Sequence, residues 1–322
     1  MNQYYVGVDV GSVSTNIVLL DNKDNQKLSE ALYLRTKGQP MESLREGFKI
    51  LQDKGYCSED ILGVGVTGSA RVLIGHIIGA DSIKNEITAH AVAAINRYPQ
   101  VKTVIEIGGQ DSKMIILREG VVVDFAMNTI CAAGTGSFLD QQAFRLNIPI
   151  EEFGEFALRT VEPVRIAGRC TVFAETDMVH KQQEGATKEQ IVAGLCEALV
   201  RNYLNNVAKG KSIEEPVLFQ GGVAFNQGIK TAFEKELGVQ LVIPEHFNVM
   251  GALGSAILAK EAIQETKKPK PTLFKGLEIM QRNHLLKRVE CRDCSNTCEL
   301  TEVTVSGEIV AKWGDRCGKW QK

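Results

Sequence analysis

The stretch VIEIGGQDSKMIILR, residues 104–118, has the same design as the earlier stretch VGVDVGSVSTNIVLL, residues 6–20. In each, an apolar strand pattern carries one acid, Glu106 or Asp9. A short turn of glycine and polar residues follows, and then an apolar return strand. This pattern predicts a β-hairpin. The matching position of the acid predicts an internal duplication, with one copy in each of two lobes.

Strand patterns alternate with amphipathic helix patterns along the rest of the chain, which is typical of the α/β class. We expect a first lobe at residues 1–98, to which residues 250–264 return, and a second lobe at residues 99–249. Charge and proline replace apolar periodicity at residues 265–284, which predicts a linker. Residues 285–322 are expected to form a small Cys-rich C-terminal unit.

The composition is that of an ordinary globular protein. The 322 residues are 44% hydrophobic and 24% charged, with a formal net charge of −2. The apolar runs are shorter than the ~20 residues that cross a bilayer. The chain start lacks the basic and apolar pattern of a signal peptide. We therefore expect a cytoplasmic protein with no membrane segment and no nucleic-acid partner.

Three glycine-containing turns have the residue types of a phosphate site. Glycine lets backbone N–H groups approach an anion, and nearby carboxylates can hold Mg²⁺ through water. One such turn usually only reverses the chain, but three at domain-scale separations are a stronger indication. The candidates are Gly11, Ser12, Val13, Ser14 and Thr15 in the first turn, Gly108, Gly109, Gln110 and Asp111 in the second, and Gly221, Gly222 and Asn226 in the third.

Cys131 and Cys170 each follow a loop and precede a helical pattern. A thiol at a helix N-terminus ionises more easily, because the helix dipole favours negative charge there. The Cys131 turn, with its glycines, could therefore hold a phosphate, a metal or both. The alternative for an isolated cysteine is a buried, inert thiol. We adopt that interpretation for Cys57 and Cys196.

Four further cysteines crowd the C-terminus with the spacing C-x2-C-x3-C-x18-C. They are Cys291, Cys294, Cys298 and Cys317. This clustering indicates a metal site, either zinc or iron–sulfur, and fits reactive surface thiols poorly. Strand patterns on either side of Ser306-Gly307 predict a hairpin that would bring Cys317 back to the other three.

Taken together, the motifs resemble those of the actin, sugar kinase and 70-kDa heat-shock ATPase superfamily. Residues 6–20 and 104–117 are similar to its two phosphate motifs, and residues 217–226 to its adenosine motif. Residues 85–94 and 251–258 resemble its two connecting helices. The resemblance implies a two-lobed, actin-like and ribonuclease H-like ATPase fold with duplicated mixed-sheet domains.

Within that superfamily, the runs EIGGQDSK, NTICAAGTGSFLD and GRCTVFAETD resemble the ATP-dependent activators of 2-hydroxyacyl-CoA dehydratases, the BadF/BadG/BcrA/BcrD type. The resemblance extends over residues 4–262. It implies ATP or ADP with Mg²⁺, and a homodimer in which Cys131 and Cys170 of both subunits hold one shared [4Fe-4S] cluster. It also implies that Gly134, Thr135 and Gly136 lie near the nucleotide.

The resemblance implies an ATPase coupled to electron transfer. Ferredoxin or flavodoxin would be the donor, and an iron–sulfur dehydratase or reductase the acceptor. Asp9 would hold Mg²⁺, while Glu106 with Gln110 or Asp111 would orient the attacking water. The alternative is a small-molecule kinase acting on a sugar, which would have no use for Cys131. A third possibility is a nucleotide-gated scaffold whose tail binds zinc and a protein partner.

Overall fold

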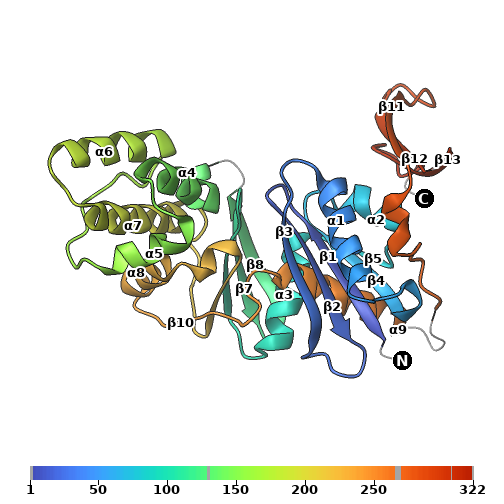
Figure 1. The fold of residues 1–322 in the computed structure, drawn as a ribbon, viewed down its shortest axis with the longest axis horizontal. Helices are drawn as coiled ribbons and strands as arrows, with labels where there is room; N and C mark the ends of the chain where they lie inside the picture. Colours follow the sequence, from blue (N-terminus) through green and yellow to red (C-terminus); the bar gives the residue numbers. More distant parts are fainter. Residues whose placement is uncertain (1–2, 129–130, 265–269, 306, 321–322) are drawn as a thin grey trace. The chain divides into compact units, whose positions relative to one another are not determined.

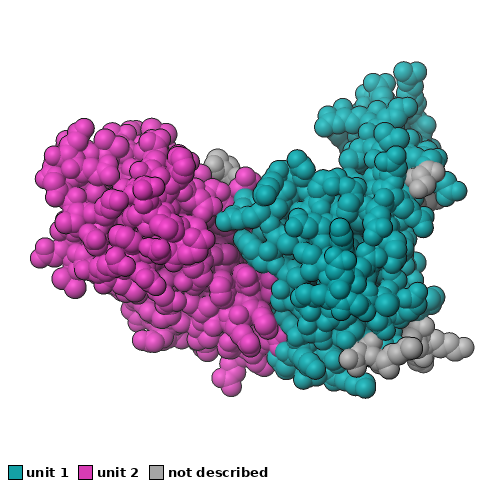
Figure 2. Space-filling view, viewed as in Figure 1, with its two compact units in different colours: residues 1–89, 251–322 teal, residues 90–250 magenta. Residues whose placement is uncertain are grey.

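The computed structural model describes residues 3–128, 131–264, 270–305 and 307–320. The chain forms two compact units, shown in different colours in Figure 2. Unit 1 comprises residues 1–89 and 251–322, and unit 2 comprises residues 90–250. Each unit contains its own five-stranded sheet.

The sheet of unit 1 has the strand order β3-β2-β1-β4-β5 (Figure 1). Its first three strands are consecutive and antiparallel, whereas β4 and β5 run parallel to β1. This arrangement confirms the hairpin predicted from residues 6–20. The strands are β1 (Tyr4–Val10), β2 (Ser14–Asp21), β3 (Leu28–Arg35), β4 (Ile61–Thr67) and β5 (Ser82–Ile83).

Helices cover both faces of this sheet. On one face, α1 and α2 pack on the alternate β1 residues Val6 and Val8. On the other face, α9 lies so close that a Cβ on Gly7 would be 1.8 Å from the Ala252 carbonyl oxygen. Small residues are therefore required where α9 crosses the sheet. The helical segments here are α1 (Pro40–Asp53), η1 (Ser58–Asp60), α2 (Arg71–Ile78), α3 (Glu86–Arg97), which runs into unit 2, and α9 (Met250–Gln264).

The C-terminal segment forms a three-stranded antiparallel sheet with the order β11-β12-β13. Its strands are β11 (His284–Glu290), β12 (Glu299–Val305) and β13 (Glu308–Trp313). The β12–β13 pair confirms the predicted hairpin, although Ser306 of its turn lies outside the described residues. Val303, Val305 and Ala311 are buried in the same core as α1 and α2.

The predicted linker at 265–284 contains the short helix η4 (Leu277–Gln281). Leu277, Ile279 and Met280 of this helix are buried in the core of unit 1. Residues 265–269 lie outside the described part of the chain. The C-terminal sheet is therefore part of unit 1, held to the rest of it by packed apolar side chains.

The sheet of unit 2 has the strand order β8-β7-β6-β9-β10. Its pairings repeat those of unit 1, with three consecutive antiparallel strands followed by two parallel ones. This repetition confirms the duplication predicted from the two hairpins. The strands are β6 (Thr103–Ile107), β7 (Ser112–Arg118), β8 (Val121–Asn128), β9 (Val217–Gln220) and β10 (Leu241–Val242).

Five α-helices of unit 2 pack together against one face of this sheet. α7 is the central helix of the group, and a capping box of Thr187 and Gln190 starts it. Within the described residues, no helix is both long and apolar enough to span a membrane. The helical segments are η2 (Ala132–Gly134), α4 (Gly136–Leu146), α5 (Ile150–Leu158), α6 (Thr171–Gln183), α7 (Lys188–Asn206), η3 (Gly222–Phe225) and α8 (Gln227–Leu237).

The rings of His76 in α2 and Trp313 in β13 are stacked, with their centroids 5.7 Å apart. This pair links the C-terminal sheet to the rest of unit 1. Burial, with a smaller effect from Lys275, lowers the pKa of His76. The unfolded chain therefore binds this proton at a higher pH than the folded chain. Above about pH 6.5, the ordinary pKa of histidine, His76 is neutral in both states and does not reduce the free energy of unfolding. As the pH falls from there toward the lower pKa of His76 in the folded chain, the free energy of unfolding should decrease.

We expect thermal unfolding followed by tryptophan fluorescence to shift to lower temperature between about pH 7.5 and about pH 5.5. Both tryptophans, Trp313 and Trp320, lie in the C-terminal segment, so their emission reports on it. A His76→Phe variant keeps an aromatic partner but has no proton to bind, so its acid shift should be smaller. An equal shift in both proteins would contradict this role of His76.

Candidate functional site

In unit 1, the candidate site is the turn between β1 and β2. The Gly11 N–H donates to the Ser14 carbonyl oxygen at 2.9 Å, which closes the turn. Ser12 is exposed at its tip, and Asp9, on the last part of β1, is partly exposed. The turn thus presents the Ser12 side chain to solvent, close in sequence to the Asp9 carboxylate, two of the groups predicted for a Mg²⁺-phosphate site.

Thr15, a candidate in the first turn, has its side chain directed into the protein. Its hydroxyl is fully buried, 3.0 Å from the Thr36 hydroxyl and 2.6 Å from the Ser43 hydroxyl. The Thr36 hydroxyl in turn donates to the Gly11 carbonyl oxygen at 2.9 Å. The Thr36 N–H donates to the Val13 carbonyl oxygen, also at 2.9 Å. The Thr15 side chain points inward because its place in β2 faces the core, and it supports the turn from within.

Gly68, directly after β4, was not among the predicted site residues. It has φ +92°, and a Cβ there would lie 2.6 Å from Asp9 Oδ1 and 2.4 Å from the Val10 carbonyl oxygen. Only glycine allows the backbone to pass so close to the carboxylate. A sequence signal exists, because TGS at 67–69 follows a strand in the same way as QGG at 220–222.

In unit 2, the second and third predicted turns come together around Glu106. The Gly108 N–H donates to the Asp111 carbonyl oxygen at 3.0 Å, the counterpart of the Gly11–Ser14 bond. Gly221 has φ +90°, and a Cβ on it would lie 2.4 Å from the Ile107 carbonyl oxygen and 2.8 Å from Glu106 Oε1. Gly221 is thus the counterpart of Gly68, and the duplication extends to the backbone around the acids.

A buried lysine, Lys113, is the residue at this site that sequence reasoning missed. Its side chain is 2% exposed, and its Nζ lies 3.0 Å from Glu106 Oε2 and 2.9 Å from Asp111 Oδ2. The Tyr203 hydroxyl donates to its carbonyl oxygen at 2.8 Å. A buried cation paired with two carboxylates fixes their positions. In unit 1, the same register position opposite the acid is occupied by Asn16.

The second turn is hydrogen-bonded to the start of α4. The Gly136 N–H donates to the Gly108 carbonyl oxygen at 2.9 Å, and the Ser137 N–H donates to the Gly109 carbonyl oxygen at 2.8 Å. Thr135 is fully buried just before them. The segment expected to lie near the nucleotide is therefore attached to the turn expected to bind its phosphates.

Cys131 is the N-cap residue of η2, and its N–H donates to Asn128 Oδ1 at 3.0 Å. Cys170 is the N-cap residue of α6, as predicted from its sequence context. Asn202 of α7 links the two segments, because its Nδ2 donates to the Gly168 carbonyl oxygen at 2.7 Å and lies 3.7 Å from Cys131 Sγ. Cys131 Sγ is also 3.8 Å from the Arg169 carbonyl oxygen.

Both thiols are partly exposed and neither is in a disulfide, so each is available as a ligand. Cys131 lies directly beside the residue that precedes Cys170, which brings the two predicted ligands to one region of unit 2. Thr129 and Ile130, at the predicted turn before Cys131, lie outside the described residues. Thiolates of this kind are the usual protein ligands of iron–sulfur clusters.

Residues 6–259 match the model of the BadF/BadG/BcrA/BcrD ATPase family. The chain belongs to this family. The 2-hydroxyisocaproyl-CoA dehydratase activator of Clostridioides difficile is 33% identical over 266 residues, which cover 82% of this chain and 98% of that protein. The (R)-2-hydroxyglutaryl-CoA dehydratase activating ATPase of Acidaminococcus fermentans is 35% identical over 261 residues, covering 80% and 98%.

The structures of family members agree with this assignment. Component A of the Acidaminococcus fermentans (R)-2-hydroxyglutaryl-CoA dehydratase has a TM-score of 0.74 at 33% identity, over 80% of this chain and 98% of that chain. The 2-hydroxyisocaproyl-CoA dehydratase activator solved with bound ADPNP has a TM-score of 0.74 at 32% identity, over 83% and 100%. The two five-stranded mixed sheets are thus those of the expected actin-like ATPase fold.

Of the two cysteines expected to be buried and inert, one is buried and the other is exposed. Cys196 is buried in α7, and its burial, with a smaller effect from Glu197, raises the pKa of its thiol to about 12. It is therefore an inert core thiol, as expected. Cys57, which was also expected to be buried, is exposed, because it lies in the turn that follows α1 and Gly55.

Asn226 and Gly222, predicted in the third turn, have local roles in the structure. Asn226 is 1% exposed, and its Oδ1 accepts from the Ile229 N–H at 3.0 Å as the N-cap of α8. Gly222 begins η3. The Asn226 side chain therefore caps α8. Within this turn, it is Gly221 that lies against Glu106.

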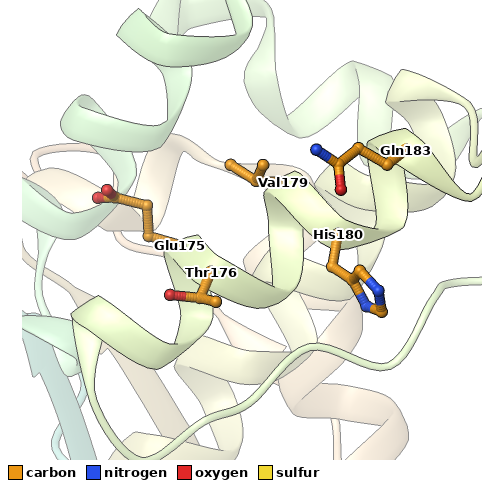
Figure 3. Close-up of a pocket in the computed structure, with 5 residues that line it drawn as sticks. All are labelled: Glu175, Thr176, Val179, His180 and Gln183. Carbon is orange, nitrogen blue, oxygen red and sulfur yellow. The ribbon is translucent and has the colours of Figure 1, made fainter.

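A shallow pocket on unit 2 lies along α6 (Figure 3). All five lining side chains, those of Glu175, Thr176, Val179, His180 and Gln183, project from this one helix. None belongs to the glycine-containing turns. The residues that line this pocket are thus not part of the nucleotide motifs. Within the described residues, no three His, Cys, Asp or Glu side chains form a group that could hold a metal ion.

The buried ion cluster predicts a large effect of Lys113→Met on stability. Removing the cation leaves Glu106 and Asp111 facing each other without compensation, which typically costs about 3–5 kcal/mol. The matched control is Lys102→Met, whose side chain is 48% exposed in its pair with Glu214 and should contribute only about 0–1 kcal/mol. Urea unfolding of both variants would measure the difference, and equal losses would contradict the role of Lys113.

Proposed function

We propose that this protein is an ATP-hydrolysing activator that delivers low-potential electrons, one at a time, to a partner iron–sulfur protein. The partner would be a 2-hydroxyacyl-CoA dehydratase or a related reductase. Support comes from the family match and from two relatives that activate such dehydratases. The match covers nearly the whole length of each relative. The observation that carries the proposal is the position of Cys131 beside the Cys170 segment and shortly before the start of α4, which is hydrogen-bonded to a glycine turn.

We assign nucleotide binding to the glycine-containing turns of the two units. Backbone N–H groups of residues 11–15 and 108–111 would bind phosphates, and Asp9 would hold Mg²⁺ through water. Glu106, with Gln110 or Asp111, would orient the attacking water, and Lys113 would hold the two carboxylates in place. A relative with bound ADPNP supports the choice of ATP as the nucleotide.

We assign the cluster to Cys131 and Cys170. Two thiolates complete only half of a four-cysteine ligand set, so the proposal requires a two-fold homodimer. A [4Fe-4S] cluster held in this way would supply reversible one-electron transfer. In the proposal, ferredoxin or flavodoxin is the donor. The protein's own contribution is to position the thiols, through the contacts that Asn128 and Asn202 make near Cys131.

The coupling between nucleotide and cluster follows from the hydrogen bonds to α4. A γ-phosphate held by the second turn would fix Gly108 and Gly109, and these accept from the Gly136 and Ser137 N–H groups. Loss of the phosphate would let the turn and the start of α4 move together. Because Cys131 begins the preceding short helix, such a movement would change the environment of the thiol.

Iron analysis under oxygen-free conditions tests the cluster assignment. Cys131→Ser and Cys170→Ser should each lower the iron and acid-labile sulfide from about two of each per chain to near zero for this site. The matched control is Cys57→Ser, an exposed cysteine in unit 1, which should leave both unchanged. Solution mass measured in parallel should be that of a dimer. Iron that survives both substitutions would refute the assignment.

ATP turnover tests the roles of the acids. Asp9→Asn and Glu106→Gln should lower the turnover number by about 10²–10⁴-fold, because each removes a charge that positions Mg²⁺ or water. Glu236→Gln, at an exposed position on α8, is the matched control and should turn over ATP normally. Iron-free protein whose ATP turnover is stimulated by a sugar would instead support the small-molecule kinase.

A further inference from the structure

Four cysteines lie around one end of the C-terminal sheet, and the proposed ATPase makes no use of them. Cys291 directly follows β11, and Cys298 directly precedes β12. Since Glu290 and Glu299 are paired in register, these two cysteines occupy the next opposed position. Cys294 lies on the connection between them. Three of the four thiols are therefore carried by one short loop.

Backbone contacts close this loop tightly. The Cys291 N–H donates to the Cys298 carbonyl oxygen at 2.8 Å, and the Thr297 N–H donates to the Cys294 carbonyl oxygen at 3.3 Å. Thr297 has φ +40°, in the left-handed region. Side chains at opposed positions of an antiparallel pair have Cβ atoms about 4.5–5.5 Å apart. The loop thus holds Cys291 and Cys298 as near neighbours.

The chain after β13 returns to the same loop. β13 runs antiparallel to β12, with Trp313 opposite Thr301. Gly314, with φ +113°, then crosses the start of β12, where a Cβ would lie 2.6 Å from the Glu299 carbonyl oxygen. Only a glycine fits here, and the crossing brings the chain next to Cys298, three residues before Cys317.

An ion pair fastens this returning segment to the loop. Lys319 Nζ lies 2.5 Å from Asp293 Oδ2, so a residue close to Cys317 is paired with one between Cys291 and Cys294. Asp315 Oδ2 accepts from the Cys317 S–H at 3.3 Å. The ion pair thus holds the segment that carries Cys317 against the loop that carries Cys291 and Cys294.

The opposed position of Cys291 and Cys298 favours a single ion over a multi-iron cluster. Zn–S bonds are about 2.3 Å long, so two ligands of one tetrahedral zinc have sulfurs about 4 Å apart. Opposed neighbours of an antiparallel pair can reach that separation without moving the backbone. Within the described residues the four thiols do not yet form a metal-holding group. Cys294 and Cys317 are exposed, so a bound ion would have to draw these two surface side chains toward Cys291 and Cys298.

We propose that Cys291, Cys294, Cys298 and Cys317 bind one zinc ion as a tetrathiolate site that fastens the end of the C-terminal sheet. The proposal is independent of the nucleotide and of the cluster on Cys131 and Cys170. Zinc has no redox chemistry, so the site is structural. It would hold the returning segment, with Trp320, against the loop that begins at Cys291.

The test measures zinc and iron separately in the full-length chain, purified without oxygen from medium that contains both metals. We expect about one zinc per chain. Cys294→Ser and Cys317→Ser should each lower zinc retained after dialysis against a chelator by about tenfold or more, while iron stays at the wild-type level. Cys57→Ser, an exposed cysteine outside the site, should retain both metals.

A second readout does not depend on the variants folding. In the zinc-loaded wild-type chain, the four C-terminal cysteines should be alkylated much more slowly than Cys57, and a strong chelator should abolish this protection. Zinc retained equally by all variants would overturn the proposal, as would alkylation at the rate of Cys57. Iron and sulfide in place of zinc, removed by Cys317→Ser, would overturn the choice of metal.

Discussion

The close passage of backbone over two strand-end carboxylates is the constraint on which both units depend. Gly68 and Gly221 each follow a strand that runs parallel to the acid-bearing strand, and each has a positive φ. A side chain at either position would collide with Asp9 or Glu106 and with the next carbonyl oxygen. The duplicated sheet therefore produces two acids with the same backbone surroundings, each next to a tight turn that can accept an anion.

The two copies then differ in what stands opposite the acid. In unit 1 this residue is Asn16, whereas in unit 2 it is the buried Lys113, which bridges Glu106 and Asp111. Unit 2 also anchors the start of α4 on its turn, and Asn202 connects the Cys131 and Cys170 segments. Unit 2 thus carries the buried ion cluster and the two cysteines to which the proposed function assigns the nucleotide chemistry and the iron–sulfur cluster.

Much of this arrangement was predictable because it follows from local patterns. The two hairpins, the helix start at Cys170 and the C-terminal hairpin are confirmed by the strands and helices observed. Two side chains do not follow from these patterns: the Thr15 hydroxyl points inward, and Cys57, which was expected to be buried, is exposed. Both depend on how a turn or strand meets the rest of the unit, which a short stretch of sequence does not encode.

By itself, the sequence determined the α/β class, the duplication and the family, because strand periodicity and glycine turns are properties of contiguous residues. Only the tertiary structure decided that Lys113 joins two acids, that Gly68 lies against Asp9 and that Asn202 reaches Cys131. These groups meet through strand pairing and helix packing between residues up to 71 positions apart. Lys113 and Asn202 are buried in these contacts, and that burial exists only after the chain has folded.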